Sequence, residues 1–227
     1  MRHSFPLFFA CLMPSLADAA RPMITDDARL TDAGACQVET WAHMGRDHRE
    51  FWALPACNPG GNFELTVGGA IAQADGYREN SARVIQGKIL FKPLETNGYG
   101  IGLAVGQARQ PGNSGSGTPY FYVPASASLA DDRLVIHTNL GYTSQGDEGV
   151  TRLTWGVGSE WQLGGRSWLI AESYGQDKGR PFFQFGLRHW LIPGHLQIDT
   201  TYGSQFGEAG PQHWLSVGLR LISLPLF

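Results

Sequence analysis

The feature that most constrains the fold is a series of short segments in which apolar and polar residues alternate. Successive side chains of a β-strand point to opposite faces, so each segment predicts a strand with one apolar and one polar face. Each is close to the about 9 to 11 residues that a tilted strand needs to cross a bilayer. The twelve expected strands are roughly residues 36–44, 50–57, 62–72, 82–92, 98–107, 118–129, 133–143, 151–163, 167–175, 181–191, 195–203 and 213–222.

The connections between these segments alternate between two kinds. One kind is short and rich in turn residues: 58–61, 93–97, 130–132, 164–166 and 192–194. The other is longer and polar: the tip around Asp47, 73–81, 108–117, 144–150, 176–180 and 204–212. Short turns on one side and longer loops on the other are typical of a bacterial outer-membrane barrel with both termini in the periplasm. Merging or splitting one hairpin changes the strand number by two, so ten and fourteen strands remain alternatives to twelve.

The start of the chain indicates export. Residues 1–19 begin with the basic Arg2, continue as an apolar run, and end with the small residues Ala17 and Ala19 just before Ala20. This pattern predicts a cleaved secretory signal peptide. After it, no stretch approaches the roughly 18 to 20 consecutive apolar residues that a membrane-spanning helix needs. We therefore expect an exported protein that can cross a membrane with strands only.

The chain ends in an alternating apolar stretch with the aromatic Phe227 as its last residue. We expect this residue to act as a signal to the outer-membrane assembly machinery. The sequence then predicts three parts: a signal peptide at 1–19, a periplasmic amino-terminal segment at 20–35 that lies on or inside the barrel opening, and an outer-membrane β-barrel at 36–227. The predicted fold class is an all-β, closed, antiparallel transmembrane barrel of about twelve strands.

Composition supports this class and excludes another. The chain has 30 Gly, 11% aromatic and only 16% charged residues, which is typical of strands that alternate between lipid and a polar interior. Its net charge is −3, and the 17 Lys and Arg residues form no cluster in the sequence, which argues against nucleic-acid binding. The expected partners are outer-membrane lipid, the assembly machinery and a small-molecule solute.

The two cysteines of the mature chain, Cys36 and Cys57, flank the first expected hairpin. The midpoint between them falls at the polar tip 46–49, so a hairpin centred there places them opposite each other. Because the periplasm is oxidising, we expect a disulfide that joins the first two strands. Two free thiols are the alternative.

The facing of the strands follows from residue parity. In the third segment Phe63, Leu65, Val67 and Ile71 share one face, and that apolar face should meet lipid. A soluble β-sandwich would bury the same face against a second sheet. A sandwich does not explain the signal peptide, the terminal aromatic residue and the alternating connection lengths together, so we favour the barrel.

The polar faces then line the interior of the barrel. Candidate lumen residues are Glu39, Glu64, Lys88, His137, Asn139, Arg152, Glu160, Glu172, Arg188, Asp199 and Arg220. Charges kept from bulk water need partners, so the first interpretation is an internal network of salt bridges and hydrogen bonds. The second is a selectivity lining for a small polar or amphipathic solute, and the third is catalysis.

Catalytic, metal and cofactor signals are weak. His137 and Asn139 share a strand face near Ser126 or Ser128, so a Ser-His-Asn grouping is open, but no Gly-x-Ser-x-Gly elbow is present. The histidines lack the spacing of a zinc site. Gly-rich stretches at 98–102 lie in an alternating strand with no helix to follow, which argues against a dinucleotide site. We therefore predict no catalytic residue, no metal and no cofactor.

Two stretches carry a family resemblance. The early segment 21–28 with 37–40, and the late segment 185–188 through 196–199 to 202–203, resemble the outer-membrane β-barrels associated with the MetA pathway of phenol degradation. The resemblance implies an outer-membrane barrel that admits aromatic or other hydrophobic small molecules, and it brings no catalytic residues. We expect a passive channel or binding barrel for small molecules. A lipid-modifying enzyme (hydrolase or acyltransferase) and a structural barrel with a closed lumen are the alternatives.

Overall fold

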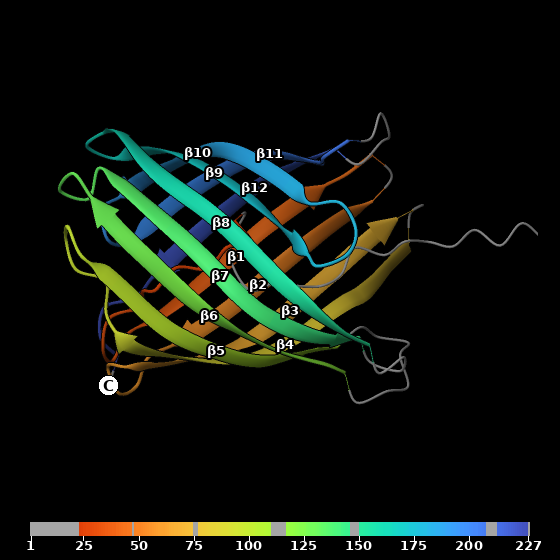
Figure 1. The fold of residues 1–227 in the computed structure, drawn as a ribbon, viewed down its shortest axis with the longest axis horizontal. Coiled ribbons are helices and arrows are strands. Elements are labelled where there is room, and N and C mark those ends of the chain that lie inside the picture. The colour runs from red at the N-terminus through yellow and green to blue at the C-terminus, as the bar shows by residue number, and fades with distance from the viewer. Residues whose placement is uncertain are drawn as a thin grey trace, which may run out of the picture.

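The computed structural model describes residues 23–46, 48–74, 77–109, 117–145, 150–207 and 213–226. The expected signal peptide at 1–19 and the terminal Phe227 lie outside these residues. The described chain is a closed antiparallel barrel in which each strand pairs with its sequence neighbours and β1 pairs with β12 (Figure 1). Nowhere in the described ranges is there a helix with the length and hydropathy of a membrane span.

The barrel has twelve strands, as the alternation predicted. They are β1 (Cys36–Met44), β2 (Arg49–Cys57), β3 (Phe63–Ala74), β4 (Tyr77–Lys92), β5 (Tyr99–Arg109), β6 (Thr118–Leu129), β7 (Leu134–Gln145), β8 (Val150–Gly164), β9 (Ser167–Gln176), β10 (Phe182–Ile192), β11 (Leu196–Gln205) and β12 (Trp214–Ile222).

One predicted loop is wrong in extent. Residues 73–81 are mostly strand, because β3 continues to Ala74 and β4 already begins at Tyr77. The first four residues of β4 all have exposed side chains, so neither face of this stretch is apolar. The sequence therefore shows no alternation of apolar and polar residues there. The backbone pairing of β3 and β4 nevertheless continues, and Arg78 pairs with Gln73. A β-bulge between Ala70 and Ile71 lies just below this extension.

The two faces of the wall differ as the parity rule predicted. On β3, Val67 points outward and is 49% exposed, whereas Glu64 points inward and is 4% exposed. Trp161 on β8 and Leu215 on β12 are likewise outward and exposed. Large exposed apolar side chains thus surround a sheet that has no free edge. Such a belt is stable in lipid and not in water, and the sandwich alternative is excluded because the sheet closes on itself.

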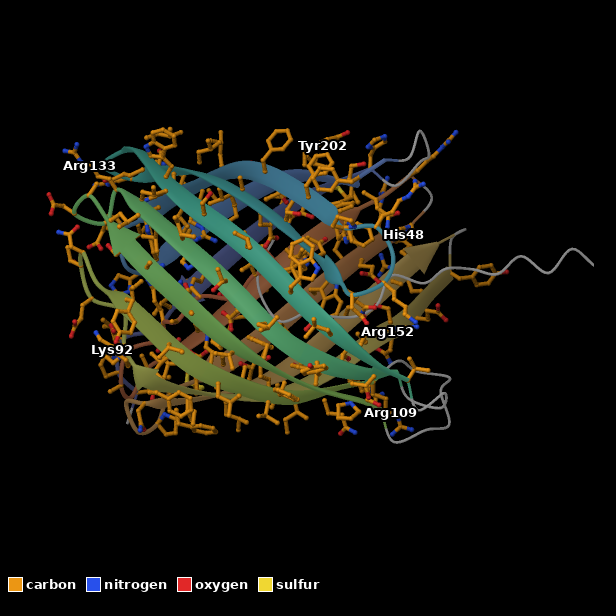
Figure 2. The ribbon with its side chains drawn as sticks, viewed as in Figure 1. His48, Lys92, Arg109, Arg133, Arg152 and Tyr202 are labelled. Carbon is orange, nitrogen blue, oxygen red and sulfur yellow. A yellow bond between two sulfur atoms is a disulfide. The ribbon has the colours of Figure 1, made fainter. Side chains whose placement is uncertain are left out.

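The two ends of the barrel carry different connections. The turn end holds the short connections, and Lys92 and Arg133 mark it in Figure 2. The loop end holds the longer connections, near His48, Arg109 and Arg152 (Figure 2). The last described residues of the chain lie at the turn end, where Leu226 N donates to Gly34 O.

Side-chain hydrogen bonds join two neighbouring turns at the turn end. Asn97 Nδ2 donates to Asp131 Oδ1 at 2.7 Å, and Asp131 N donates back to Asn97 Oδ1 at 2.8 Å. Both residues, and Ala130, have positive φ, which is uncommon for residues other than glycine. Ser128 and Thr96 both donate to Asp132, and these hydrogen bonds hold the pKa of its carboxyl below the usual value. The reciprocal pair therefore stabilises a left-handed turn without glycine.

The predicted disulfide is confirmed. Cys36 and Cys57 are direct register partners on β1 and β2, and their sulfur atoms are bonded. The bond closes the first hairpin at the turn end, with a sequence separation of 21 residues.

Replacing Cys36 and Cys57 with serine should lower the free energy of unfolding by about 3 kcal/mol, because the unfolded chain regains the entropy of an open loop. Urea unfolding of the refolded protein in detergent micelles measures this change. Reduction of the wild-type protein serves as the matched control and should give the same shift. Identical urea midpoints for the oxidised wild type and the serine variant would contradict the expectation.

Candidate functional site

The interior of the barrel holds a segment of its own chain. Residues 23–35 precede β1 and lie in the lumen, from the middle of the barrel to the turn end. At the middle, Thr25 lies against Gly156 of β8, and at the turn end Gly34 N donates to Asn58 O at 2.8 Å. We call residues 23–35 the lumen segment. It is joined to the wall mainly by side-chain hydrogen bonds, not by a strand ladder.

Two inward glycines of β8 make room for this segment. A Cβ at Gly156 would lie 2.6 Å from Thr25 Oγ1, and a Cβ at Gly158 would lie 2.6 Å from Met23 Cε. Both distances are too short for real contacts. The absence of side chains at these two positions is therefore what lets the segment approach the wall.

A carboxylate of β9 binds the start of the segment. Ile24 N donates to Glu172 Oε1 and Thr25 N donates to Glu172 Oε2, both at 2.7 Å. Gln184 Nε2 donates to the same carboxylate at 2.5 Å. A carboxylate that accepts from two successive backbone amides fixes the position of the backbone without requiring a particular side chain on it.

The next residues of the segment bind β6 and β7. Asn139 accepts from Asp26 N at 2.7 Å and donates to Asp26 O at 2.9 Å, so its amide satisfies both backbone groups of one residue. Two residues on, Ala28 N donates to Ser126 Oγ at 2.9 Å. These contacts account for the buried backbone polar groups that a non-strand segment would otherwise leave unpaired.

A buried ion pair holds the acidic part of the segment. Lys88 Nζ lies 3.0 Å from both carboxylate oxygens of Asp26, and its side chain is 6% exposed. Asp27 Oδ1 also lies near this ammonium group, at 4.0 Å. Tyr122 Oη also donates to Asp26 at 2.8 Å. Removing either member of such a pair leaves an uncompensated buried charge.

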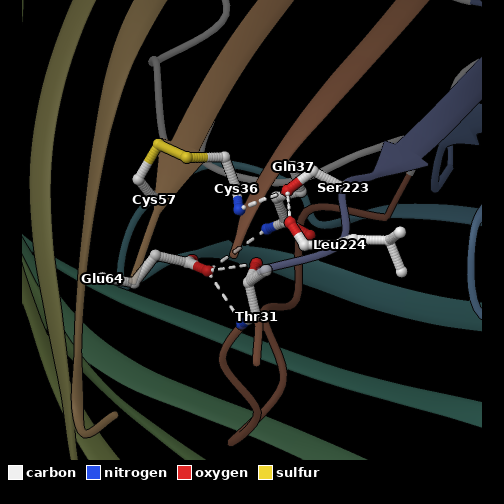
Figure 3. Close-up of a disulfide and its surroundings, with 7 residues drawn as sticks. All are labelled: Thr31, Cys36, Gln37, Cys57, Glu64, Ser223 and Leu224. Carbon is white, nitrogen blue, oxygen red and sulfur yellow. Dashed lines mark hydrogen bonds between the residues drawn. A yellow bond between two sulfur atoms is a disulfide. The ribbon is translucent and has the colours of Figure 1, made fainter. Parts of the chain in front are cut away.

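At the turn end, Glu64 of β3 accepts three hydrogen bonds. They come from Thr31 N at 2.9 Å, Thr31 Oγ1 at 2.7 Å and Gln37 Nε2 at 3.5 Å (Figure 3). Asn58 Nδ2 donates to the carbonyl of the same threonine at 2.6 Å. This cluster lies beside the disulfide of Cys36, so the end of the segment is fixed where the first hairpin is covalently closed.

Two further charge clusters lie on the wall itself. Arg188 of β10 donates to Glu160 at 2.5 Å and to Asp199 at 2.8 Å, and Arg29 of the lumen segment lies 3.7 Å from Glu160. Among the other predicted lumen residues, Arg220 lies 3.7 Å from Glu39 and donates to Gln37 Oε1 at 2.6 Å.

One predicted lumen residue lies apart from these clusters. Arg152 is at the loop end of β8, opposite Thr143, and forms no ion pair with a described residue (Figure 2). The parity of β8 places its side chain on the same face as Glu160 but eight residues closer to the loops.

The serine and histidine considered for catalysis do meet, but not with Asn139. Ser126 Oγ lies 2.8 Å from His137 Nδ1, and His137 Nε2 lies 3.3 Å from Glu160 Oε1. The serine also accepts from Ala28 N, and Ser126 and His137 are 3% and 1% exposed. A nucleophile needs room for a substrate next to its hydroxyl. Here the lumen segment occupies that room. The contacts from Ala28 through Ser126 and His137 to Glu160 therefore hold the segment against the wall.

Sequence reasoning missed the residues that the segment itself contributes. Asp26, Asp27 and Arg29 provide the partners of Lys88 and Glu160, yet they precede the first alternating strand. The available signal was the adjacent acidic pair in a short segment before β1. In the described ranges no three His, Cys, Asp or Glu side chains gather into a group that could hold a metal ion.

A small cavity lies in the charged half of the lumen. A cavity of about 30 Å³ lies between the segment and the wall, where Asp26, Lys88, Glu64, Glu39 and Arg220 surround it. A cavity measured in this way needs about 10 to 15 Å³ to hold one water molecule, so this one has room for about two. Between the segment and this part of the wall there is thus room for water but not for a solute molecule.

The loop-end half of the lumen is lined by aromatic side chains. The inward rings of Trp41 and Trp52 are stacked, with centroids 5.3 Å apart. Trp214 packs against His43 at 5.3 Å and Phe182 at 6.0 Å. Continuing around the wall, Phe182 stacks on Tyr174, while Tyr120 stacks on Tyr122. The lumen therefore changes from aromatic at the loop end to charged at the turn end.

Comparison with known proteins agrees with this architecture. A family model described as "Uncharacterised conserved protein UCP029691" matches residues 7–222. The chain belongs to that family. No curated protein sequence matches it significantly.

Solved structures with the same fold are porins. The KdgM porin in complex with disordered oligogalacturonate has a TM-score of 0.64 at 12% identity, over 83% of this chain and 99% of that one. The NanC porin has a TM-score of 0.58 at 11% identity, over 84% and 100%. The Acinetobacter baumannii outer membrane protein Omp33 has a TM-score of 0.52 at 7% identity, over 82% and 96%. At these identities the likeness establishes the fold, which is that of outer-membrane porins.

Lys88→Met should loosen the lumen segment, because it removes the charge that binds Asp26. We expect trypsin to cleave the folded barrel after Arg29 about tenfold faster or more, since a lost charge-assisted hydrogen bond of 1.5 to 3 kcal/mol shifts the open population by that factor. Mass spectrometry of the released peptide measures the rate.

Lys92→Met is the matched control. Lys92 forms an exposed pair with Glu95 at the turn end, 2.9 Å away, and does not touch the segment. Its variant should be cleaved after Arg29 at the wild-type rate. Equal rates for Lys88→Met and Lys92→Met would show that the ion pair does not hold the segment.

Proposed function

We propose that this protein is an outer-membrane channel for small molecules with an aromatic or apolar face, and that the lumen segment limits passage through it. The observation that carries the proposal is that residues 23–35 occupy the charged half of the lumen through hydrogen bonds and through ion pairs of Asp26, Asp27 and Arg29 with the wall. Contacts of this kind break and reform without disturbing the strand ladder of the barrel.

The location follows from the wall. The exposed apolar belt needs lipid, and the short turns support an orientation in which the turn end, with Cys36 and Cys57, faces the periplasm. The disulfide is consistent with that oxidising compartment. In this proposal residues 1–19 are removed on export, and Phe227 is recognised by the assembly machinery before the wall contacts outer-membrane lipid.

The class of solute follows from the loop-end half of the lumen. Aromatic side chains that are only partly buried there, such as Phe182 and Trp214, can bind other rings and the apolar faces of small molecules. A resemblance to the barrels of phenol degradation suggests aromatic solutes. KdgM has been solved with an oligogalacturonate, and sugar rings also present apolar faces. Both solute classes suit the same aromatic lining.

A planar-bilayer experiment tests the channel proposal. The wild-type barrel should give small current steps in KCl, and deletion of residues 23–30 should enlarge them severalfold, because Glu172, Asn139 and Lys88 then face an open lumen. The deletion spares Thr31 and Gly34, which bind the wall near the disulfide. Heat-modifiable migration on a gel shows that the variant is folded.

The alternatives give different results in the same preparation. A folded deletion variant that carries no more current than the wild type would indicate a structural barrel with a closed lumen. Hydrolysis of lipid by the wild type that disappears in His137→Ala would indicate an enzyme instead.

A further inference from the structure

Two arginines face each other on the outside of the barrel. Arg83 of β4 and Arg109 of β5 are direct register partners near the loop end, and both side chains are exposed. Residues paired in this way have Cα atoms about 4.5 to 5.5 Å apart, and like charges at such positions repel each other. Neither guanidinium forms an ion pair with a described carboxylate. An anion that binds both would remove the repulsion.

More positive charge lies about 13 Å farther along the strands toward the loop end, since Gln73 is four residues from Gly69, the partner of Arg83. Arg78 of β4 and Arg49 of β2 are also exposed, and both are register partners of Gln73 on β3. No described Asp or Glu on β2–β5 lies on this outward face near the loop end, since Glu50 and Glu79 have the opposite parity. Four arginines therefore form an outward basic patch on a chain whose net charge is −3.

The patch lies at the height of a membrane surface. Arg83 is eight residues from the outward Phe91 at the turn end, which is roughly 20 Å along the barrel axis for a strand tilted by about 40°. The apolar belt of such barrels is about 25 Å tall. The outward Ile85 and Val105, which are 51% and 54% exposed, mark lipid-facing wall next to the arginine pair. Arg83 and Arg109 therefore lie where acyl chains meet headgroups.

An outward hollow adjoins the arginine pair. It has a volume of about 370 Å³ and is lined by Phe51, Ala53, Gly69, Ile71 and Arg83, among others. It exists because Gly69 has no side chain and Ala53 opposite it has a small one. The ladder between β2 and β3 is also interrupted at Pro55, which lacks an N–H. The lining is apolar except at its rim, where Asn80 and Arg83 lie.

We propose that this face binds a phosphorylated lipid of the outer leaflet. Arg83 and Arg109 hold the lipid phosphate, with Arg78 and Arg49 farther toward the loop end, and one acyl chain lies in the hollow over Gly69 and Ala53. Guanidinium groups bind phosphate oxygens in bidentate fashion, and basic clusters at a membrane surface recognise anionic headgroups. The positive charge of the arginines favours a negatively charged headgroup. The apolar hollow favours a lipid, which has an acyl chain, over a free anion.

Native mass spectrometry of the full-length mature barrel tests this proposal. The barrel in detergent micelles is mixed with diphosphoryl lipid A, and retained lipid is counted per barrel. Arg83→Gln combined with Arg109→Gln should reduce retention about tenfold or more, since each charge-assisted contact is worth roughly 1.5 to 3 kcal/mol. Lipid A without phosphates is the second probe. Its retention by the wild type should be as low as the retention of diphosphoryl lipid A by the double variant, or lower.

Two further variants sharpen the test. Arg133→Gln combined with Arg166→Gln removes two exposed arginines at the turn end, and this control should retain lipid like the wild type. Ala53→Phe fills the hollow and leaves every arginine in place, so it should also reduce retention. Millimolar inorganic phosphate should not displace the lipid.

The outcomes that overturn the proposal are specific. Equal retention by the wild type and the Arg83 and Arg109 double variant would show that the pair does not bind the headgroup. Displacement by inorganic phosphate, with no effect of Ala53→Phe, would show a simple anion site. Heat-modifiable migration confirms that each variant is a folded barrel before it is measured.

Discussion

Closure of the sheet is the constraint on which the rest of this structure depends. β1 pairs with β12 over its length, so the sheet of the described residues closes on itself and has no edge strand. In lipid each unpaired N–H or C=O would cost several kcal/mol, and a closed ladder avoids that cost. Once the sheet closes, every strand has one face outside and one inside, and alternation in the sequence becomes a division between lipid and lumen.

Closure also leaves charged side chains inside the barrel, and the lumen segment provides partners for several of them. Inward charges such as Lys88, Glu64 and Glu172 are kept from bulk water and need partners. Wall residues supply some of them, as Arg188 does for Glu160 and Asp199. Other partners come from the segment, through the carboxylate of Asp26 and its backbone amides. The same contacts that satisfy the wall therefore narrow the passage, so stability of the closed lumen and control of passage share one set of interactions.

The sequence was sufficient for the wall because a period of two is a local signal. The alternation of Phe63, Leu65 and Val67 with Glu64 and Thr66 determines facing and register together, and the position of Cys36 and Cys57 follows from the first hairpin. It was insufficient where both faces are polar, as at the start of β4. It predicted a segment on or inside the barrel opening but not the contacts of the lumen segment, several of which join residues more than a hundred positions apart, such as Asp26 and Asn139. No local pattern encodes which inward residues an irregular segment will meet.

The central claim is that residues 23–30 lie in the lumen against β8, and an engineered cross-link tests it most directly. A Cβ built on Gly156 lies 3.4 Å from Thr25 Cβ, close to the separation in a disulfide. Thr25→Cys combined with Gly156→Cys, with Cys36 and Cys57 changed to serine, should form a disulfide in the membrane-inserted barrel. Mass spectrometry should then recover the two linked peptides in high yield. Free alkylation of both thiols in the folded barrel would contradict the account.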